Sequence, residues 1–246
     1  MEKLYLSDNL VFDKNKPYKL FCSVAKKEKL YWYSAQFRAL NDYAYYITES
    51  INNRVKIFDE NMKEILEHMQ NEESNDIENQ QCIIDEEFGD YDPVADYLGV
   101  EEEKILWLGI TEPISKNTII MNFLSFAEGV IKEMTFDFIN NLKPDDKIDN
   151  KFNKNIIENC LRKISYYCEK DLSKELKKEI NIIKQAKKVR NTFVHEQWIS
   201  TENNVWDFKT REQLEKISIV DLINSITNIL KTIERIGIEL GVYSLY

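Results

Sequence analysis

The fold of this chain is decided by residues 115–142, which read SKNTIIMNFLSFAEGVIKEMTFDFINNL. Large apolar side chains recur there at spacings of three and four: Ile119, Phe123, Phe126, Val130, Met134 and Phe138. This period places them on one side of an α-helix. Ser115 is expected to cap the start of that helix, and Lys143-Pro144 is expected to end it.

Three further helices are predicted downstream. They cover residues from about 153 to 170, from about 174 to 195 or 198, and from about 211 to 240. Asp171 or Ser173 is expected to cap the middle one, a polar loop over 199–208 follows it, and Gly241 suits the end of the last. Four helices with short connections predict an all-α, up-and-down bundle.

The part of the chain before this bundle is predicted as a long additional helical region with an acidic insertion. Apolar residues at helical spacing run from Lys26 to Met69, in one helix or in two joined near Asn52-Asn53. Residues 70–103 are acidic and weakly periodic, which is typical of a loop, with a short helix from Pro93 that Gly99 would end. We therefore divide the chain into residues 1–104, with the acidic loop, and residues 105–246, the bundle.

The sequence pattern does not decide the secondary structure of two short stretches. Residues 1–25 are irregular and favour one or two short strands. Residues 105–110 form a short apolar run that suits a buried strand or a turn of helix, and periodicity does not distinguish the two.

The composition favours a cytoplasmic helical protein without a metal or another cofactor. Only six Gly and four Pro occur in 246 residues, which favours long uninterrupted helices. The four cysteines lack the paired spacing of a metal site, and Cys160 and Cys168 are expected to share a helix face in the core. His68, four residues after Glu64, lacks a third ligand nearby and is expected to be solvated. We find no signal peptide and no apolar run long enough to cross a bilayer, so no membrane association is expected.

Charge is distributed unevenly along the chain. The formal net charge is −10, but residues 151–190 hold twelve Lys or Arg against five Asp or Glu. Residues 59–103 hold seventeen acidic residues against one lysine. Because salt screens charge over about 8–10 Å, a local basic block attracts phosphates whatever the total charge is. The alternative is that the basic block is an ordinary solvated helix surface.

The basic block leads into Arg190-Asn191-Thr192-Phe193-Val194-His195, which holds one of the two histidines of the chain. Histidine exchanges protons near neutral pH, since its unperturbed pKa is about 6.5. Arginine grips a phosphate with two donors at once. A base beside a phosphate clamp is what phosphodiester cleavage without a metal requires.

This arrangement of Arg190, Asn191 and His195 resembles the signature of the HEPN superfamily, an arginine and a polar residue followed by a histidine four to six positions after the arginine. The resemblance covers about half of the chain and implies an α-helical, dimeric, metal-independent RNA endonuclease, a bacterial toxin or a phage-defence effector, with an antitoxin or defence-system protein as a possible partner. It assigns acid–base catalysis to His195, phosphate stabilisation to Arg190, and orientation of His195 or phosphate binding to Asn191. Lys184, Lys187 and Lys188 would contact flanking RNA phosphates, and Glu128 would reach the cleft.

Helix geometry adds a condition to this assignment. Ile182, Ala186, Val189 and Phe193 are predicted to form the bundle-facing stripe of their helix. On a regular helix the side chains of Arg190 and His195 then point about 140° apart, so a single helix does not bring the two side chains to one substrate. A two-fold dimer would solve this by letting each copy supply one edge of a shared cleft.

Two other interpretations stay open. The protein could be a non-catalytic HEPN-like module that binds RNA, a nucleotide or a protein partner. His195 could also be a histidine favoured by a helix end, with Arg190 paired to Glu196 or Glu179. A further hypothesis is that the acidic residues 70–103 shield the basic cleft and restrain activity.

Overall fold

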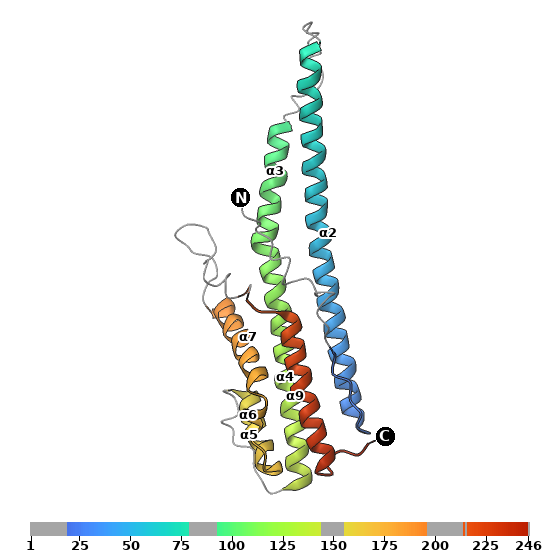
Figure 1. The fold of residues 1–246 in the computed structure, drawn as a ribbon, viewed down its shortest axis with the longest axis vertical. Helices are drawn as coiled ribbons and strands as arrows, with labels where there is room; N and C mark the ends of the chain where they lie inside the picture. Colours follow the sequence, from blue (N-terminus) through green and yellow to red (C-terminus); the bar gives the residue numbers. More distant parts are fainter. Residues whose placement is uncertain (1–18, 79–92, 144–154, 196–213, 215, 246) are drawn as a thin grey trace.

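The computed structural model describes residues 19–78, 93–143, 155–195, 214 and 216–245, which form an elongated all-α bundle (Figure 1). Its elements in chain order are α2 (Glu28–Glu78), α3 (Pro93–Leu106), the π-helix η1 (Trp107–Thr111), α4 (Glu112–Leu142), α5 (Ile156–Cys168), α6 (Leu172–Glu175), α7 (Lys177–His195) and α9 (Ile219–Glu239). The described residues contain no strand, and their one isolated β-bridge joins Ala25 to Leu245. The all-α prediction is confirmed. Strands were expected within residues 1–25: residues 19–25 form none beyond the Ala25 bridge, and residues 1–18 lie outside the described part.

Helix α4 is the centre of the bundle, because α2, α5, α7 and α9 all pack against it. Of the six apolar side chains that predicted this helix, five are buried. The sixth, Phe126, is half-buried and stacks on Phe37 of α2 with ring centroids 5.2 Å apart. The same core includes Phe21, Leu30 and Ala44, so the first part of the chain belongs to the bundle and is not a separate layer.

The predicted start of α4 is wrong. Ser115 lies inside a helical run that continues from α3 through η1 into α4, and its hydroxyl donates to the Thr111 carbonyl at 2.7 Å. The wide π turn precedes Pro113, whose ring and missing N–H do not fit the interior of a regular α-helix. The helix therefore accommodates the proline without ending. Residues 105–110 are accordingly helical, and the predicted end at Leu142 is confirmed.

The predicted acidic loop is also wrong over most of its length. Residues 70–78 continue α2, residues 93–103 belong to α3, and Gly99 does not end that helix. The two helices pair side by side beyond the bundle (Figure 1), where Arg54 Nη2 lies 2.9 Å from Glu103 Oε1 and Lys104 pairs with Asp59. Part of the acidic charge is thus matched by cations across the hairpin. Residues 79–92 lie outside the described part.

The starts of α6 and α9 and the end of α9 follow local capping chemistry. Asp171 caps α6 by accepting a hydrogen bond from the Lys174 N–H at 3.1 Å, and Ser218 caps α9 through the Asp221 N–H at 3.2 Å. Gly241 has φ +74°, the left-handed conformation that suits a helix end, as predicted. Helix α9 begins later than the expected residue 211, and the predicted loop 199–208 lies outside the described residues.

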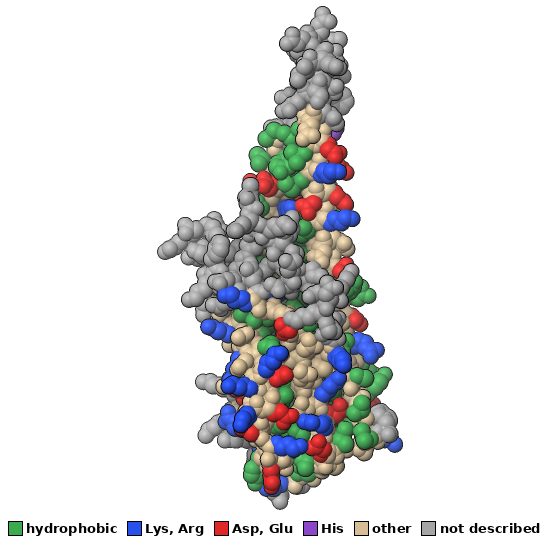
Figure 2. All heavy atoms as spheres, in the orientation of Figure 1, with side chains coloured by type: hydrophobic (Ala, Val, Ile, Leu, Met, Phe, Trp, Pro, Cys, Tyr) green, Lys and Arg blue, Asp and Glu red, His purple; other side chains and the backbone are tan. Residues whose placement is uncertain are grey.

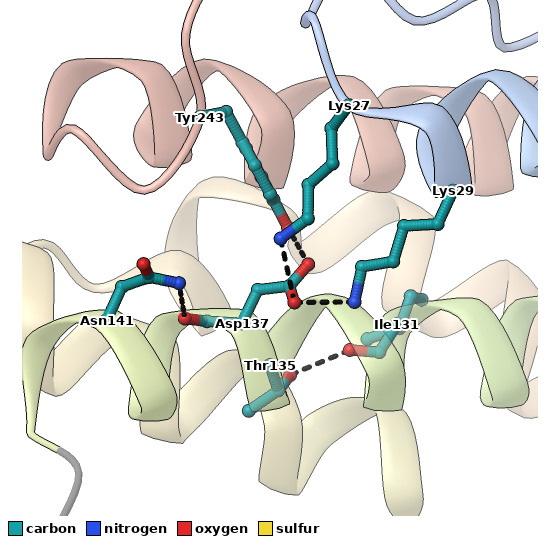
Figure 3. A network of polar contacts seen from close by, with 7 residues as sticks. All are labelled: Lys27, Lys29, Ile131, Thr135, Asp137, Asn141 and Tyr243. Carbon is teal, nitrogen blue, oxygen red and sulfur yellow. Dashed lines mark hydrogen bonds and ion pairs between the residues drawn. The ribbon is translucent and has the colours of Figure 1, made fainter.

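A polar network fastens the two ends of the described chain to α4 (Figure 3). The Asp137 carboxylate lies 2.9 Å from Lys27 Nζ and 2.5 Å from Lys29 Nζ, and it accepts a hydrogen bond from the Tyr243 hydroxyl at 3.1 Å. Burial raises the pKa of Tyr243, and the negative charge of Asp137 raises it further. The phenol therefore stays protonated and donates at any physiological pH.

Gly237 of α9 leaves the space that the Tyr243 ring fills. A Cβ at position 237 would lie 2.3 Å from Tyr243 Cδ2. We expect Gly237→Ala to lower the free energy of unfolding by about 1–3 kcal/mol, as overpacked core substitutions do. Urea unfolding followed by circular dichroism measures it.

Gly129→Ala is the matched control for this prediction. Gly129 lies within α4, and a Cβ there meets nothing within 4 Å. Alanine should stabilise that position by up to about 1 kcal/mol through helix propensity. Equal effects of the two substitutions would contradict the proposed contact with Tyr243.

Candidate functional site

The Arg–Asn–His motif occupies the last turns of α7, which packs against α4 and α9. The buried residues of this helix are Ile180, Ile183, Ala186 and Val189. Two members of the predicted stripe, Ile182 and Phe193, are only half-buried, so that stripe is partly wrong. The buried face of α7 differs from the predicted one because α7 packs against both α4 and α9. Arg190 follows Ile183 and Ala186 by seven and four residues, and it therefore lies on the bundle side of the helix.

Arg190 and Asn191 are in direct contact. The Arg190 Nε and Nη2 groups donate to Asn191 Oδ1 at 3.2 and 3.0 Å. Arg190 is half-buried and Asn191 is exposed. A single oxygen held by two guanidinium donors occupies a place that a phosphate oxygen can take. The structure therefore brings together two of the three predicted catalytic residues. The backbone of His195 ends α7, and its side chain lies outside what the structure describes.

The three predicted RNA-contacting lysines differ in their surroundings. Lys187 Nζ lies 2.8 Å from Glu128 Oε1, and Lys184 Nζ lies 2.6 Å from Glu158 Oε1. These four side chains line a hollow of about 30 Å³ between α4, α5 and α7. Lys188 is exposed. Two of the three cations are thus partly neutralised by carboxylates from neighbouring helices.

Glu128 does reach α7, but its contact is with Lys187. The pairing of Lys184 with Glu158 was not predictable from sequence spacing, because the two residues are far apart in sequence and on different helices. Among the alternatives for Arg190, Glu179 accepts a hydrogen bond from Asn228 Nδ2 at 3.2 Å, and Glu196 lies outside the described residues.

A basic surface nevertheless surrounds these residues. Figure 2 shows Lys and Arg side chains gathered along the side of the bundle where α5, α6 and α7 lie. The exposed lysines of α6 and α7 are Lys174, Lys177, Lys178, Lys184 and Lys188. Such a surface attracts a polyanion over about a Debye length.

Asn117 is a buried polar residue of α4 that the sequence pattern missed. It is 3% exposed, and its Oδ1 has no hydrogen-bond partner among the residues that the structure describes. It lies eleven residues, or about three turns, before Glu128, so it shares the α4 face that meets α7. Helix α7 runs antiparallel to α4 (Figure 1), so the motif end of α7 lies at the same end of the bundle as the first turns of α4. An amide that points into the bundle gives no signal in a single sequence.

Cys160, Cys168 and the second histidine do not add to this site. Burial raises the pKa of Cys160 to about 11, so its thiol is protonated at neutral pH and is a poor nucleophile. Cys160 is buried and Cys168 packs half-buried against the core, as predicted. His68 lines an open hollow of about 480 Å³ between α2 and α3 with Glu64 and Asp96, among others. No group of three or more potential ligands suited to a metal ion occurs among the described residues.

Comparisons with known proteins leave the family undetermined. No protein-family model matches the chain, and no curated protein or solved structure is significantly similar to it. Among the described residues, no helix is both long enough and apolar enough to cross a membrane.

Proposed function

We propose that the protein is a metal-independent RNA endonuclease of the HEPN type, with His195 as acid–base catalyst and Arg190 as phosphate-stabilising residue. The observation that carries this proposal is the contact of the Arg190 guanidinium with Asn191 in the turn before His195 at the end of α7. A role as a bacterial toxin or phage-defence effector, with an antitoxin or another defence protein as partner, belongs to the same proposal.

The proposed reaction uses the ribose as its own nucleophile. An imidazole of His195 accepts the 2′-hydroxyl proton as the 2′-oxygen attacks the adjacent phosphorus, and the bond to the 5′-oxygen breaks. The imidazolium of His195 gives that proton to the leaving 5′-oxygen, which yields a 2′,3′-cyclic phosphate and a 5′-hydroxyl and restores the neutral imidazole. Arg190 stabilises the charge that builds up on the phosphate oxygens.

Lysine contacts along α7 would hold the flanking RNA. Lys188 is exposed and should contribute most. Lys184 and Lys187 would have to give up their glutamate partners in order to bind a phosphate, which reduces the net free energy that each contributes to RNA binding. A two-fold pairing of α7 ends would complete each site with residues from both copies.

Cleavage of RNA in the presence of EDTA tests this proposal. We expect wild-type protein to cut single-stranded RNA internally, to leave 2′,3′-cyclic phosphate ends, and not to cut the same sequence made with 2′-deoxyribose. Mass spectrometry of the products identifies the ends. A requirement for a divalent metal, or equal cleavage of the deoxy substrate, would refute the mechanism.

The second candidate is a non-catalytic module that binds RNA, a nucleotide or a protein partner. The pairing of Lys184 and Lys187 with glutamates favours the form of this candidate that binds a protein partner, since those cations are partly neutralised and attract RNA less. Under this candidate, clean wild-type protein binds its ligand and cleaves no RNA.

A further inference from the structure

Helix α2 carries a second stripe, in which apolar residues predominate, on the side that faces away from the bundle. This outer stripe consists of Trp32, Gln36, Ala39, Tyr43, Tyr46, Ser50, Asn53 and Ile57. The spacings alternate between four and three without exception, which is the heptad repeat of a coiled-coil seam. All eight side chains are exposed, whereas the bundle side of the same helix buries Leu30, Phe37, Ala44, Ile51 and Phe58.

The large members of the outer stripe expose an unusual amount of apolar surface. Trp32 is 55% exposed, Tyr46 is 71% exposed, and Ile57 is 43% exposed. Figure 2 shows hydrophobic side chains at the edge of the molecule formed by the lower half of α2. The stripe is bounded, because Glu60 and Glu64 follow at the positions where its period would continue. A bounded apolar seam with a coiled-coil period indicates a helical partner.

We propose that the outer stripe binds the outer stripe of a second copy of this chain, in antiparallel orientation. With the two-fold axis between residues 44 and 45, Trp32 faces Ile57 of the second copy and Tyr43 faces its Tyr46. Ala39 then faces Ser50, so small residues lie opposite small ones. Gln36 faces Asn53, an amide pair that fixes the register as buried polar residues do in coiled coils.

Charge selects the antiparallel orientation over the parallel one. The start of α2 and the residues just before it carry Lys26, Lys27, Lys29 and Arg38 against Glu28, and the ion pairs of Lys27 and Lys29 with Asp137 leave Lys26 and Arg38 to act at the surface. Beyond the stripe, Asp59, Glu60 and Glu67 pair with lysines of their own chain, and Glu64 adds a further negative charge. Antiparallel pairing places the basic end of each copy beside the acidic end of the other, and parallel pairing would place the acidic ends together.

This interface is separate from the motif of α7. Helix α4 packs against both α2 and α7, and it lies between them in the bundle (Figure 1). Pairing through α2 therefore leaves the α7 ends accessible, and the inference does not depend on the proposed nuclease activity.

Light scattering after size-exclusion chromatography tests the proposal. Tyr46→Glu should halve the mass of the wild-type assembly while circular dichroism stays unchanged, because the side chain lies outside the core. Leu66→Glu is the matched control, since Leu66 is an exposed apolar residue of α2 on another face and should leave the mass unaltered. A monomeric wild type, or a mass that Tyr46→Glu does not change, would overturn the proposal.

Cysteine cross-linking tests the orientation. In the antiparallel register, Ala39→Cys protein and Ser50→Cys protein should form a disulfide between positions 39 and 50 when the two are mixed, and mass spectrometry of the linked peptides identifies it. Neither variant alone should link to itself at the new cysteine. Self-linking of Ala39→Cys would show a parallel pair and overturn the antiparallel arrangement.

Discussion

A His195→Ala variant should keep the helical bundle and lose RNA cleavage by roughly 100- to 10,000-fold, the range that a general acid–base group contributes. Alanine neither accepts the proton from the 2′-hydroxyl nor donates one to the leaving oxygen. Binding of RNA should persist, because Arg190 and the α6–α7 lysines remain. Initial rates on labelled RNA in EDTA, with affinity measured on the uncleavable 2′-deoxy strand, separate the two effects.

The chain provides its own control in His68→Ala. This is the other histidine, on the distal half of α2, away from α7 (Figure 1). It should leave the cleavage rate unchanged. Undiminished cleavage by His195→Ala would remove His195 from the mechanism.

The largest effect on stability is expected at Glu234 of α9. This carboxylate is 3% exposed and accepts hydrogen bonds from the Ser23 hydroxyl, from the Val24 N–H at 2.9 Å and from the Ala25 N–H at 3.0 Å. Glu234→Ala removes the shared acceptor of these three donors, of which the Ala25 N–H is buried and the other two are partly buried, and each buried donor that loses its partner costs about 1–3 kcal/mol. We expect the free energy of unfolding to fall by about 3–5 kcal/mol, measured by urea denaturation.

Glu234→Gln is the informative comparison. Its amide oxygen can still accept from the two backbone N–H groups, so it should lose less than half as much stability as Glu234→Ala. Equal losses in the two variants would mean that the negative charge, rather than the hydrogen bonds, stabilises the Ser23–Ala25 segment.

The helices of the bundle were largely predictable, and the places where prediction failed have identifiable physical causes. The apolar period of α4 correctly predicted most of its core residues, since a helix that packs on one side buries the apolar side chains that recur every three or four positions. Ser115 precedes an apolar run, which predicts a cap, but the π turn before Pro113 lets the helix continue through it. The acidic residues of α3 favoured the prediction of a loop. That prediction failed because Glu103 is paired with Arg54 of α2, and such a contact across the hairpin is not visible in local sequence.

In the candidate site too, contacts within one helix could be predicted from the sequence and contacts between helices could not. Arg190 and Asn191 are neighbours in sequence, and their contact follows from one side chain reaching the next. Their partners on other helices do not follow from local spacing. Glu128 meets Lys187, and Glu158 meets Lys184, only because α4, α5 and α7 pack together.

Sequence by itself determined the helical class of this protein, the end of α4, the position of the motif at the end of α7 and the core-facing period of α2, because these depend on intervals of a few residues. Tertiary packing decided which face of α7 is buried, which lysines are paired with carboxylates, and that the α2–α3 hairpin projects beyond the bundle. Those features arise from contacts between residues far apart in the chain, and the spacing within one helix does not specify which neighbour it will meet.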